Sequence, residues 1–238
     1  MADVTDITQS EEFLKAKLTA LAEFAAGAGH EINNPVATIA GRVELLLKEE
    51  SNPERRQALL TIGAQALRIR DMIGDVMLFA RPPMPELKSL DLVTVVDDVC
   101  QKLSDSFRVK SLTVDRRGEP SVSILADAVQ LRVVISSLLS NAVNASNSGG
   151  AITVKCETHL LTADSWAVLS VHDHGLGLTA NECEHLFDPF FSGRQAGRGL
   201  GFGLSKCWRI IEQHGGHIEC QSSPETGTIF RVHWPMTA

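Results

Sequence analysis

The residues with the clearest capacity for chemistry are His30 and Glu31, which are neighbours within a predicted helix. If the apolar positions of that helix face a partner helix, His30 falls on the opposite, solvent-facing side. An exposed imidazole can act as a nucleophile, and Glu31 can accept its proton or orient the ring so that one nitrogen is free to attack. An isolated His-Glu pair is more often part of an ordinary charged helix surface than a catalytic pair. The surrounding residues are therefore needed to distinguish the two interpretations.

A second group of residues has the character of a nucleotide site. Asp173 follows an apolar strand predicted at residues 168–171, where a carboxylate can accept a hydrogen bond from an adenine amino group. Gly175 and Gly177 come directly after it and would let backbone approach a ligand closely. A glycine-rich run at residues 197–204 then opens a predicted helix, whose first N–H groups and dipole favour phosphate. Each feature alone is common, and an ordinary strand-to-turn connection would explain Asp173 equally well.

Two long helices are expected to position His30. Over residues 13–48 apolar side chains recur at alternating spacings of three and four, and the alternation returns over residues 59–80. Residues 51–53 interrupt it with turn-forming types, which predicts an antiparallel helical hairpin. A lone hairpin cannot bury both apolar seams well, so we expect a homodimer in which two hairpins form a four-helix bundle. The alternative is that the hairpin is the helical half of one larger single-chain core.

Prolines at positions 82, 83 and 85 mark a change of structure. Proline removes a backbone donor and restricts its predecessor, so the second helix should end near Arg81 and residues 82–86 should form a hinge. Beyond the hinge the pattern mixes helices and strands, which predicts an α+β protein whose second domain is an α/β layer sandwich. The expected helices are 92–107, 128–145 and 203–214, and the expected strands are 112–115, 122–125, 152–157, 168–171, 217–221 and 229–233.

The composition narrows the class of protein. A formal net charge of −7 gives no general attraction to phosphate backbones or anionic lipid, so nucleic acid is not an expected partner. The five cysteines are scattered and never form a C-x-x-C pair, which argues against disulfides or a zinc-cysteine site and for a reducing, cytoplasmic location. No apolar run has the length that a membrane span needs, and the acidic N-terminus is unlike a signal peptide.

The string from His30 to Pro35 reads H-E-I-N-N-P, and with it the chain resembles the sensor histidine kinase family, whose phosphoacceptor box is H-E-[IL]-x-N-P. The resemblance implies that His30 is phosphorylated from ATP and that Glu31 assists. It also implies a role for Asn34, because a polar residue at this spacing supports dephosphorylation of the partner protein in the family. Asn34 lies four residues after His30 and therefore on the same helical face.

The resemblance continues to the C-terminal end. Asn141 and Asn144, in L-L-S-N-A-V-N-A, match the segment where the family places its Mg²⁺ ligand, which implies that Asn141 binds the metal. Asp173 matches the adenine-binding aspartate, although His174 stands where the family usually has Asn and Ser137 where many members have another Asn. The remaining residues that the resemblance assigns to the nucleotide site and its mobile lid are Gly175, Gly177, Phe190, Arg194, Gly197, Gly199, Leu200, Gly201 and Gly203.

The resemblance thus implies three regions and one activity. Residues 1–81 would be the dimerisation and phosphoacceptor domain, 82–86 the hinge, and 87–238 a catalytic domain of the fold shared by type II topoisomerases, mismatch-repair ATPases and certain chaperones. The chain would be an ATP- and Mg²⁺-dependent protein-histidine kinase of a two-component phosphorelay. Since this sequence leaves no segment for a receiver domain, the acceptor aspartate is expected on a separate response regulator. Residues 1–10 are too few for a sensory domain, which leaves two alternatives: this sequence is part of a longer chain, or the stimulus comes from a separate sensory protein.

Two other functions agree with the same residues. In the first, the chain is chiefly a phosphatase of its partner, which Glu31 and Asn34 would permit. In the second it is a dimeric scaffold that binds ATP without enzymatic activity, for which the departures at Ser137 and His174 are the only support in the sequence. Incubation with γ-labelled ATP would separate the three functions.

Overall fold

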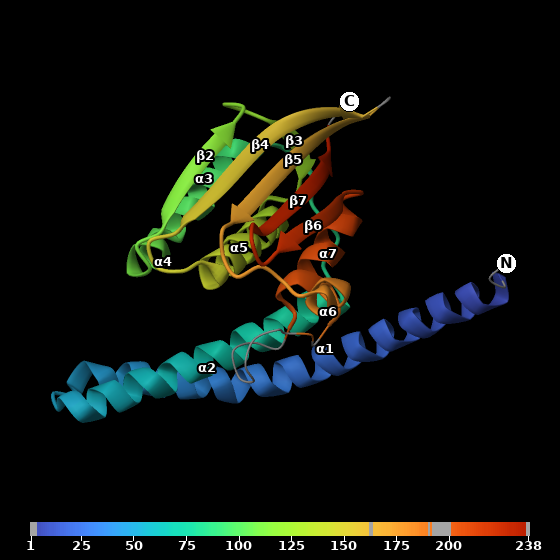
Figure 1. Cartoon of the computed structure of the whole chain (residues 1–238). Helices are drawn as coiled ribbons and strands as arrows, with labels where there is room; N and C mark the ends of the chain where they lie inside the picture. The colour runs from blue at the N-terminus through green and yellow to red at the C-terminus, as the bar shows by residue number, and fades with distance from the viewer. Residues whose placement is uncertain (1–3, 162–163, 190, 192–200, 237–238) are drawn as a thin grey trace. The chain divides into compact units, whose positions relative to one another are not determined.

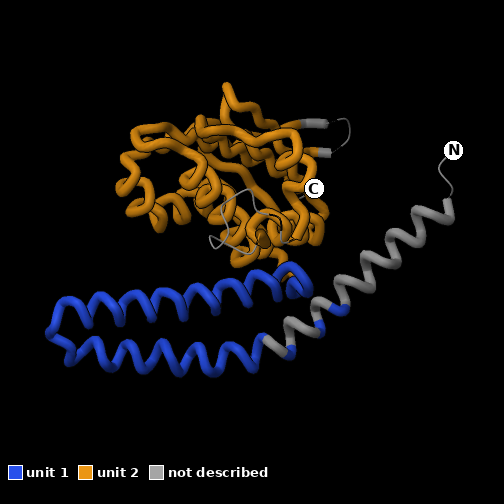
Figure 2. The backbone as a smooth tube through the Cα atoms, turned by 60° about the horizontal axis from the view of Figure 1, so that its bottom comes forward, with its two compact units in different colours: residues 1–83 blue, residues 84–238 orange. Residues whose placement is uncertain are grey.

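The computed structural model describes residues 4–161, 164–189, 191 and 201–236. The chain divides into two compact units, Met1–Pro83 and Met84–Ala238 (Figure 2), and each is described here by itself. Within the described residues, no helix is both long enough and apolar enough to cross a membrane.

The first unit is the predicted hairpin of two helices. Helix α1 (Val4–Glu49) and helix α2 (Pro53–Ala80) lie side by side (Figure 1). Asn52 ends the turn between them, and its side-chain oxygen accepts hydrogen bonds from the N–H groups of Glu54 and Arg55 at 3.0 and 3.1 Å. This cap and the proline at the first helical position explain why α2 begins where it does. Arg81 caps the other end of α2, as the prolines after it predict.

Only part of the apolar surface of the hairpin is covered within one chain. Val36, Val43 and Ala66 are buried, and Gly63 lies against the Val43 side chain, so one face of each helix is used for packing. A second set of apolar side chains remains exposed, with Ile62 at 48% and Ile69 at 41%. These two residues are one heptad apart, which is the repeat expected of a further helix-packing seam. The hairpin therefore presents a second apolar face.

The second unit is a two-layer sandwich. Its larger sheet has five strands in the order β2-β4-β5-β7-β6, and all neighbours are antiparallel except β2 and β4 (Figure 1). A two-stranded sheet pairs β1 with β3. The strands are β1 (Lys88–Asp91), β2 (Thr113–Gly118), β3 (Ser123–Ala126), β4 (Ala151–Leu161), β5 (Asp164–Asp173), β6 (His217–Ser223) and β7 (Gly227–Pro235).

The helices α3 (Leu92–Lys102), α5 (Ala128–Ala145) and α7 (Gly203–Gln213) form the second layer, against one face of the large sheet. Helix α5 is central because Leu131, Ile135 and Leu138, spaced by three or four residues, are completely buried in the core. Burying one such side chain stabilises a fold by about 1.5–3 kcal/mol. The position of α5 is therefore strongly determined, and its predicted bounds are confirmed.

One local prediction is wrong, and two short elements were not predicted. The single helix expected at residues 92–107 is wrong: α3 ends at Lys102, and a separate helix α4 (Ser104–Val109) follows. Leu103 adopts φ −90° and ψ 3°, which interrupts the α-helical path, and Phe107 of α4 joins the core. Strand β1 and the short helix α6 (Ala180–Glu184) were not predicted, because neither has a recognisable apolar period.

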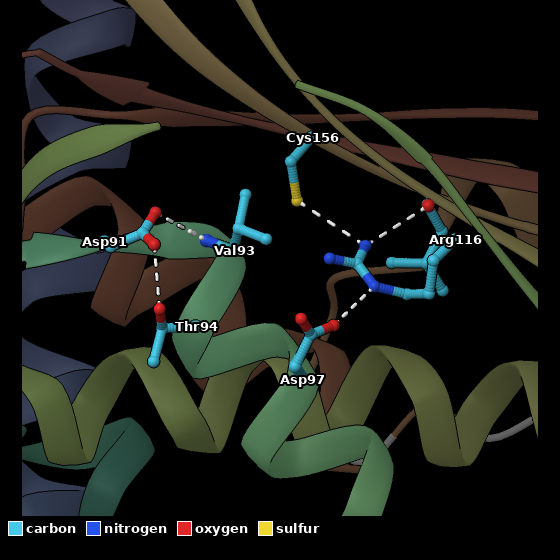
Figure 3. A network of polar contacts seen from close by, with 7 residues as sticks. Asp91, Val93, Thr94, Asp97, Arg116 and Cys156 are labelled. Carbon is cyan, nitrogen blue, oxygen red and sulfur yellow. Dashed lines mark hydrogen bonds and ion pairs between the residues drawn. The ribbon is translucent and has the colours of Figure 1, made fainter. Parts of the chain in front are cut away.

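A polar network fixes α3 at the edge of the core (Figure 3). Asp91 caps the helix by accepting hydrogen bonds from the Val93 N–H at 3.2 Å and the Thr94 hydroxyl at 2.7 Å. Further along α3, Asp97 accepts a hydrogen bond of 2.7 Å from Nε of Arg116 on β2. Helix α3 is therefore capped at its first turn and bound to strand β2 by an ion pair.

Asp91 also fixes the start of β3, since it accepts a hydrogen bond of 3.0 Å from the N–H of Val122, the residue before this strand. Partial burial raises the pKa of Asp91, but the hydrogen bonds from Val122, Thr94 and Val93 outweigh this effect and lower the pKa overall. The carboxylate form thus stabilises the fold. That stabilisation is present above the unfolded-state pKa of about 3.9 and is lost as the pH falls through the folded-state pKa.

We expect Asp91→Ala to lower the free energy of unfolding by about 1–2 kcal/mol at pH 7, the usual effect of losing a helix cap. The difference from the parent chain should shrink as the pH is lowered below about 4, because the parent then loses the same interaction. Urea unfolding followed by circular dichroism measures both. Asp105→Ala is the control, since Asp105 is 83% exposed and pairs only with exposed Arg108. An equal effect of the two substitutions would contradict the assignment.

Candidate functional site

His30 is presented to solvent by the packing of the residue before it. Gly29 is buried, and a Cβ atom there would lie 3.0 Å from Sδ of Met77 and 3.4 Å from Cγ2 of Ile73 on α2. Glycine thus lets the two helices approach closely at this turn. His30 and Glu31, which follow on α1, are both exposed. The predicted exposure of His30 is confirmed.

The turn after His30 is modified by Pro35. Proline has no N–H, so the carbonyl of Glu31 lacks its usual partner four residues on. The Thr38 hydroxyl donates a hydrogen bond of 3.0 Å to the carbonyl of Asn34. Asn34 is exposed, and its spacing places it on the same face of α1 as His30, one turn away. These three exposed polar side chains, His30, Glu31 and Asn34, form one continuous polar surface.

Asp173 is the buried carboxylate of the second unit. It ends strand β5 and is only 2% exposed, and its Oδ1 accepts a hydrogen bond of 3.0 Å from the N–H of Gly175. Burial raises the pKa of Asp173, although the backbone hydrogen bonds from Gly175 and Thr228 act in the opposite direction. A carboxylate held in this way has little water around it, so a ligand donor that reaches it forms a strong hydrogen bond.

Glycines fix the turn that follows Asp173. A Cβ atom on Gly175 would collide with the carbonyl oxygen of Ala145 at the end of α5. Gly177 has φ +67°, and a Cβ atom there would collide with the carbonyl oxygen of Ser223 in β6. The turn therefore lies in direct backbone contact with α5 on one side and β6 on the other.

The end of α5 brings Asn141 and Asn144 to the same place. Asn141 lies one helical turn before Ala145, is half-buried, and is therefore close in the fold to the turn after Asp173. Asn144 is exposed, and its Nδ2 donates a hydrogen bond of 2.6 Å to the carbonyl of Ser140. Tertiary structure thus brings the two asparagines close to the turn that contains Asp173, Gly175 and Gly177. The asparagines and this turn are more than 25 positions apart in the sequence.

Helix α7 begins at a glycine-rich turn. Gly201 has φ +76°, and Phe202, which is buried, occupies the N-cap position without a side-chain hydrogen bond. No atom lies within 4 Å of the Cβ position of Gly203 in the described structure. The first N–H groups of a helix have no partner within the helix itself and suit phosphate. The other predicted members of this region, Phe190, Arg194, Gly197, Gly199 and Leu200, lie outside the described residues.

Three residues that the sequence analysis did not single out hold α5 in place. Lys110 Nζ donates hydrogen bonds to the carbonyls of Val143 at 2.8 Å and Ser146 at 3.1 Å, and so caps the end of α5 that carries the asparagines. At the other end, Asp127 caps the first N–H groups of α5, and its own N–H donates to Nε2 of His214 at 3.1 Å.

The His214 ring connects α5 to the end of α7. Its Nδ1 is 2.8 Å from the carbonyl of Ile210, so Nδ1 donates and Nε2 accepts, which fixes one neutral tautomer. An aspartate just before an apolar helix is a recognisable cap, and Asp127 could have been found in this way. The partners of His214 and Lys110 are distant in sequence, so nothing local identifies these two residues.

His174, one of the two departures from the family pattern, has an anchored position. Its ring lies 4.1 Å from the ring of His172, and its Nδ1 is 3.3 Å from the carbonyl of Ala151. His172 in turn contacts the carbonyl of Thr226 through Nε2 at 3.0 Å. The two histidines therefore connect β5 with β4 and with the β6–β7 turn. His174 is exposed whereas Asp173 is buried, and the contacts of His174 support the shape of the turn.

Comparison with known proteins agrees with both units. Residues 20–84 match the family model described as His Kinase A (phospho-acceptor) domain, and residues 126–238 match that of the histidine kinase-, DNA gyrase B- and HSP90-like ATPases. The chain belongs to the sensor histidine kinase family. Among the relatives of this chain are sensor histidine kinase ZraS of Klebsiella oxytoca, 32% identical over 224 residues, and sporulation kinase C of Bacillus subtilis (strain 168), 27% identical over 248 residues.

These relatives are longer than this chain. The alignments cover 93% and 99% of the chain but 47% of ZraS and 56% of sporulation kinase C, so the chain spans about half the length of these relatives. Among solved structures, ShkA in complex with AMPPNP has the same fold, with a TM-score of 0.77 at 22% identity, covering 91% of this chain and 46% of ShkA. The catalytic domain of histidine kinase ThkA, at 27% identity, gives a TM-score of 0.57 over 64% of this chain and 97% of that domain.

We expect Asp173→Asn to weaken ATP binding at least tenfold, because the amide presents a neutral and partly donating group where the carboxylate would accept from adenine. Folding should be preserved, since the Asn oxygen can still accept from the Gly175 N–H and no buried charge remains. Isothermal titration calorimetry measures the affinity and thermal unfolding the stability. Asp115→Asn, at a half-exposed ion pair with Arg117, is the matched control. Unchanged ATP binding would rule out the adenine contact.

Proposed function

We propose that this chain is an ATP-dependent protein-histidine kinase that phosphorylates its own His30 and passes the phosphoryl group to an aspartate of a separate response regulator. One observation carries the proposal: an exposed His-Glu pair stands in a phosphoacceptor-family hairpin, and the same chain holds an ATPase-family domain with a buried, oriented carboxylate. The covalent step needs an accessible nucleophile and a nucleotide site, and the two units supply one each.

The nucleotide is bound between the end of α5, the Asp173 turn and the start of α7. Asp173 accepts a hydrogen bond from the adenine amino group, and the N–H groups at Gly201 and Gly203 contact phosphate. Asn141 holds Mg²⁺ through its side-chain oxygen, a neutral hard ligand that suits this cation beside phosphate oxygens and water, and Asn144 lies at the same end of α5. When bound, the metal neutralises charge on the phosphates.

In the phosphorylation step, a ring nitrogen of His30 attacks the γ-phosphorus of ATP. A nitrogen–phosphorus bond forms, the bond from the γ-phosphorus to the bridging oxygen breaks, and ADP leaves with that electron pair. Glu31 orients the imidazole and accepts the proton that the ring releases. The resemblance assigns stabilisation of the charge on the phosphoryl oxygens to Arg194 and the segment from Gly199 to Gly203, and it assigns the nucleotide lid to a segment that includes Phe190, Gly197 and Leu200.

Partners follow from the same proposal. The exposed heptad face of the hairpin is covered by a second copy of the chain, giving a homodimeric four-helix bundle. A receiver domain docks on the polar surface of His30, Glu31 and Asn34. A solved complex of histidine kinase ThkA with response regulator protein TrrA shares the fold, with a TM-score of 0.64 at 23% identity over 99% of this chain and 68% of that chain. The separate sensory protein and the cytoplasmic location stay predictions.

The proposal predicts that His30→Gln abolishes incorporation of label from γ-labelled ATP and leaves ATP affinity within about twofold, because the nucleophile and the nucleotide site belong to different units. The label on the parent chain should be acid-labile and alkali-stable. His185→Gln is the control, since His185 is a partly exposed histidine of the second unit paired with Asp188. Label retained by the His30 variant would refute the assignment. Nucleotide binding without any label on the parent would favour the scaffold function.

We predict that the parent chain is a dimer at micromolar concentration and that Ile62→Glu shifts it toward the monomer, because a charge would then lie in the proposed interface. Size-exclusion chromatography with light scattering measures the mass. Ala64→Glu is the control, because Ala64 is also exposed but lies two residues away, on the opposite side of α2. A monomeric parent, or an equal effect of the two substitutions, would contradict the bundle.

Phosphatase activity on the same partner is a further part of the proposal, supported by the exposure of Asn34 one turn from His30. There its amide can position a water beside a phosphoaspartate. We expect Asn34→Ala to keep autophosphorylation within about threefold and to slow dephosphorylation of the response regulator at least tenfold. Both rates are measured on one preparation. A parallel fall in the two would mean that Asn34 acts only through the local shape of α1 at Pro35.

A further inference from the structure

A cluster of possible metal ligands lies on the face of the large sheet opposite to the helices, away from the nucleotide site. His217 of β6 and His233 of β7 are directly opposite each other in the strand register, and Glu219 is two residues along β6 on the same face. Glu219 Oε1 lies 3.7 Å from Nε2 of His217 and 3.8 Å from Nε2 of His233. The three candidate ligand atoms are all within 4.8 Å of one another.

His233 is the unusual member of this cluster. Its side chain is only 8% exposed, yet neither ring nitrogen has a hydrogen-bond partner within the described part of the chain. The contact of Nε2 with Glu219, at 3.8 Å, is too long to be a hydrogen bond. Buried polar atoms are rarely left without a partner, because each such atom costs free energy that a partner would recover. Burial thus holds the His233 ring in place, and its two nitrogens have no hydrogen-bond partner among the described residues.

We propose that His217, Glu219 and His233 form a binding site for a divalent transition-metal cation of the zinc class. Two imidazole nitrogens and one carboxylate oxygen are a common ligand set for Zn²⁺, with water in the fourth position. Ligand atoms on a tetrahedral zinc ion, at bond lengths of about 2.0–2.1 Å, lie roughly 3.3 Å apart. Both pairs that include Glu219 need to close by less than about half an ångström to reach this separation.

The movement required is confined to the exposed members. His217 and Glu219 have side chains that are 48% and 50% exposed, whereas His233 is fixed by burial. The His217 and His233 rings are stacked 4.1 Å apart at an interplanar angle of 8°. Because a metal lies in the plane of each imidazole that binds it, the His217 ring must turn out of this stack when the cation enters. His217 is 48% exposed, which leaves room for this turn, and its ring makes an edge contact with Trp166.

The other charged groups on this face determine which cations fit. Arg231 lies opposite Glu219 in the strand register, and the nearby His159 is 3.1 Å from its own partner Glu157. The positive charge of Arg231 disfavours cations that bind through charge alone, such as Mg²⁺ and Ca²⁺, which also prefer several oxygen ligands. Zinc-class cations form stronger bonds to neutral imidazole nitrogen and are therefore favoured here.

The test uses the untagged full chain, free of nucleotide and Mg²⁺, so that no other metal site contributes. Isothermal titration calorimetry with Zn²⁺ should show one site per chain, and thermal unfolding should show a rise in Tm with zinc that EDTA reverses. Co²⁺ should give the intense visible absorption of a tetrahedral complex. His217→Gln and Glu219→Gln, both at exposed positions, should each weaken zinc binding at least tenfold and abolish the Co²⁺ spectrum. His233→Gln should do the same if its fold is retained.

The matched control is His185→Gln, which removes another partly exposed histidine and should leave zinc affinity unchanged. The proposal is overturned if the parent chain binds no zinc at micromolar concentrations. It is also overturned if the His217 and His185 variants bind equally well, which would indicate scattered surface histidines. Neither result bears on the proposed kinase function, because all measurements are made without ATP.

Discussion

At the end of β5 the backbone meets other backbone with no side chain in between, and the proposed nucleotide site depends on this contact. Gly175 lies against the carbonyl of Ala145, and Gly227, at φ +79°, lies against the carbonyl of Asp173. Any larger residue at either position would push apart α5, the β5 end and the β6–β7 turn. The contact places Asp173 beside the helix that carries Asn141. It helps to hold the buried carboxylate of Asp173 in a defined orientation, together with the hydrogen bond from the Gly175 N–H.

The helices around this contact are fixed by polar groups at their ends and by apolar groups along their length. Burial of one side of α5 sets its position on the sheet, but a smooth apolar stripe alone would permit sliding along the helix axis. Lys110 at one end and Asp127 with His214 at the other remove that freedom. The position of the two asparagines along the axis of α5 is therefore fixed relative to Asp173. A binding site built on such supports needs little reorganisation when its ligand arrives.

The first unit, the helical hairpin, does not bury all of its apolar side chains within one chain. Its hairpin satisfies one apolar face within the chain and leaves the heptad pair Ile62 and Ile69 in water, so its stability and its proposed function are both expected to depend on association. His30 lies on neither apolar face, because Gly29 takes the inward position at that turn. His30 can thus remain accessible in the proposed dimer. This arrangement suits the proposed role, in which His30 would meet first a nucleotide and then a partner protein.

The sequence by itself determined the helical hairpin, the exposed position of His30, the bounds of α5 and the strands of the large sheet, because each depends on a local period or a local breaker. It also predicted a nucleotide site that includes Asp173, Gly175 and Gly177, through motifs that are contiguous in the chain. Only the tertiary structure decided that α3 and α4 are separate, that Lys110 and His214 support α5, and that His217, Glu219 and His233 converge. Those features join residues up to 87 positions apart, and contacts over such separations depend on how the elements pack rather than on any local pattern.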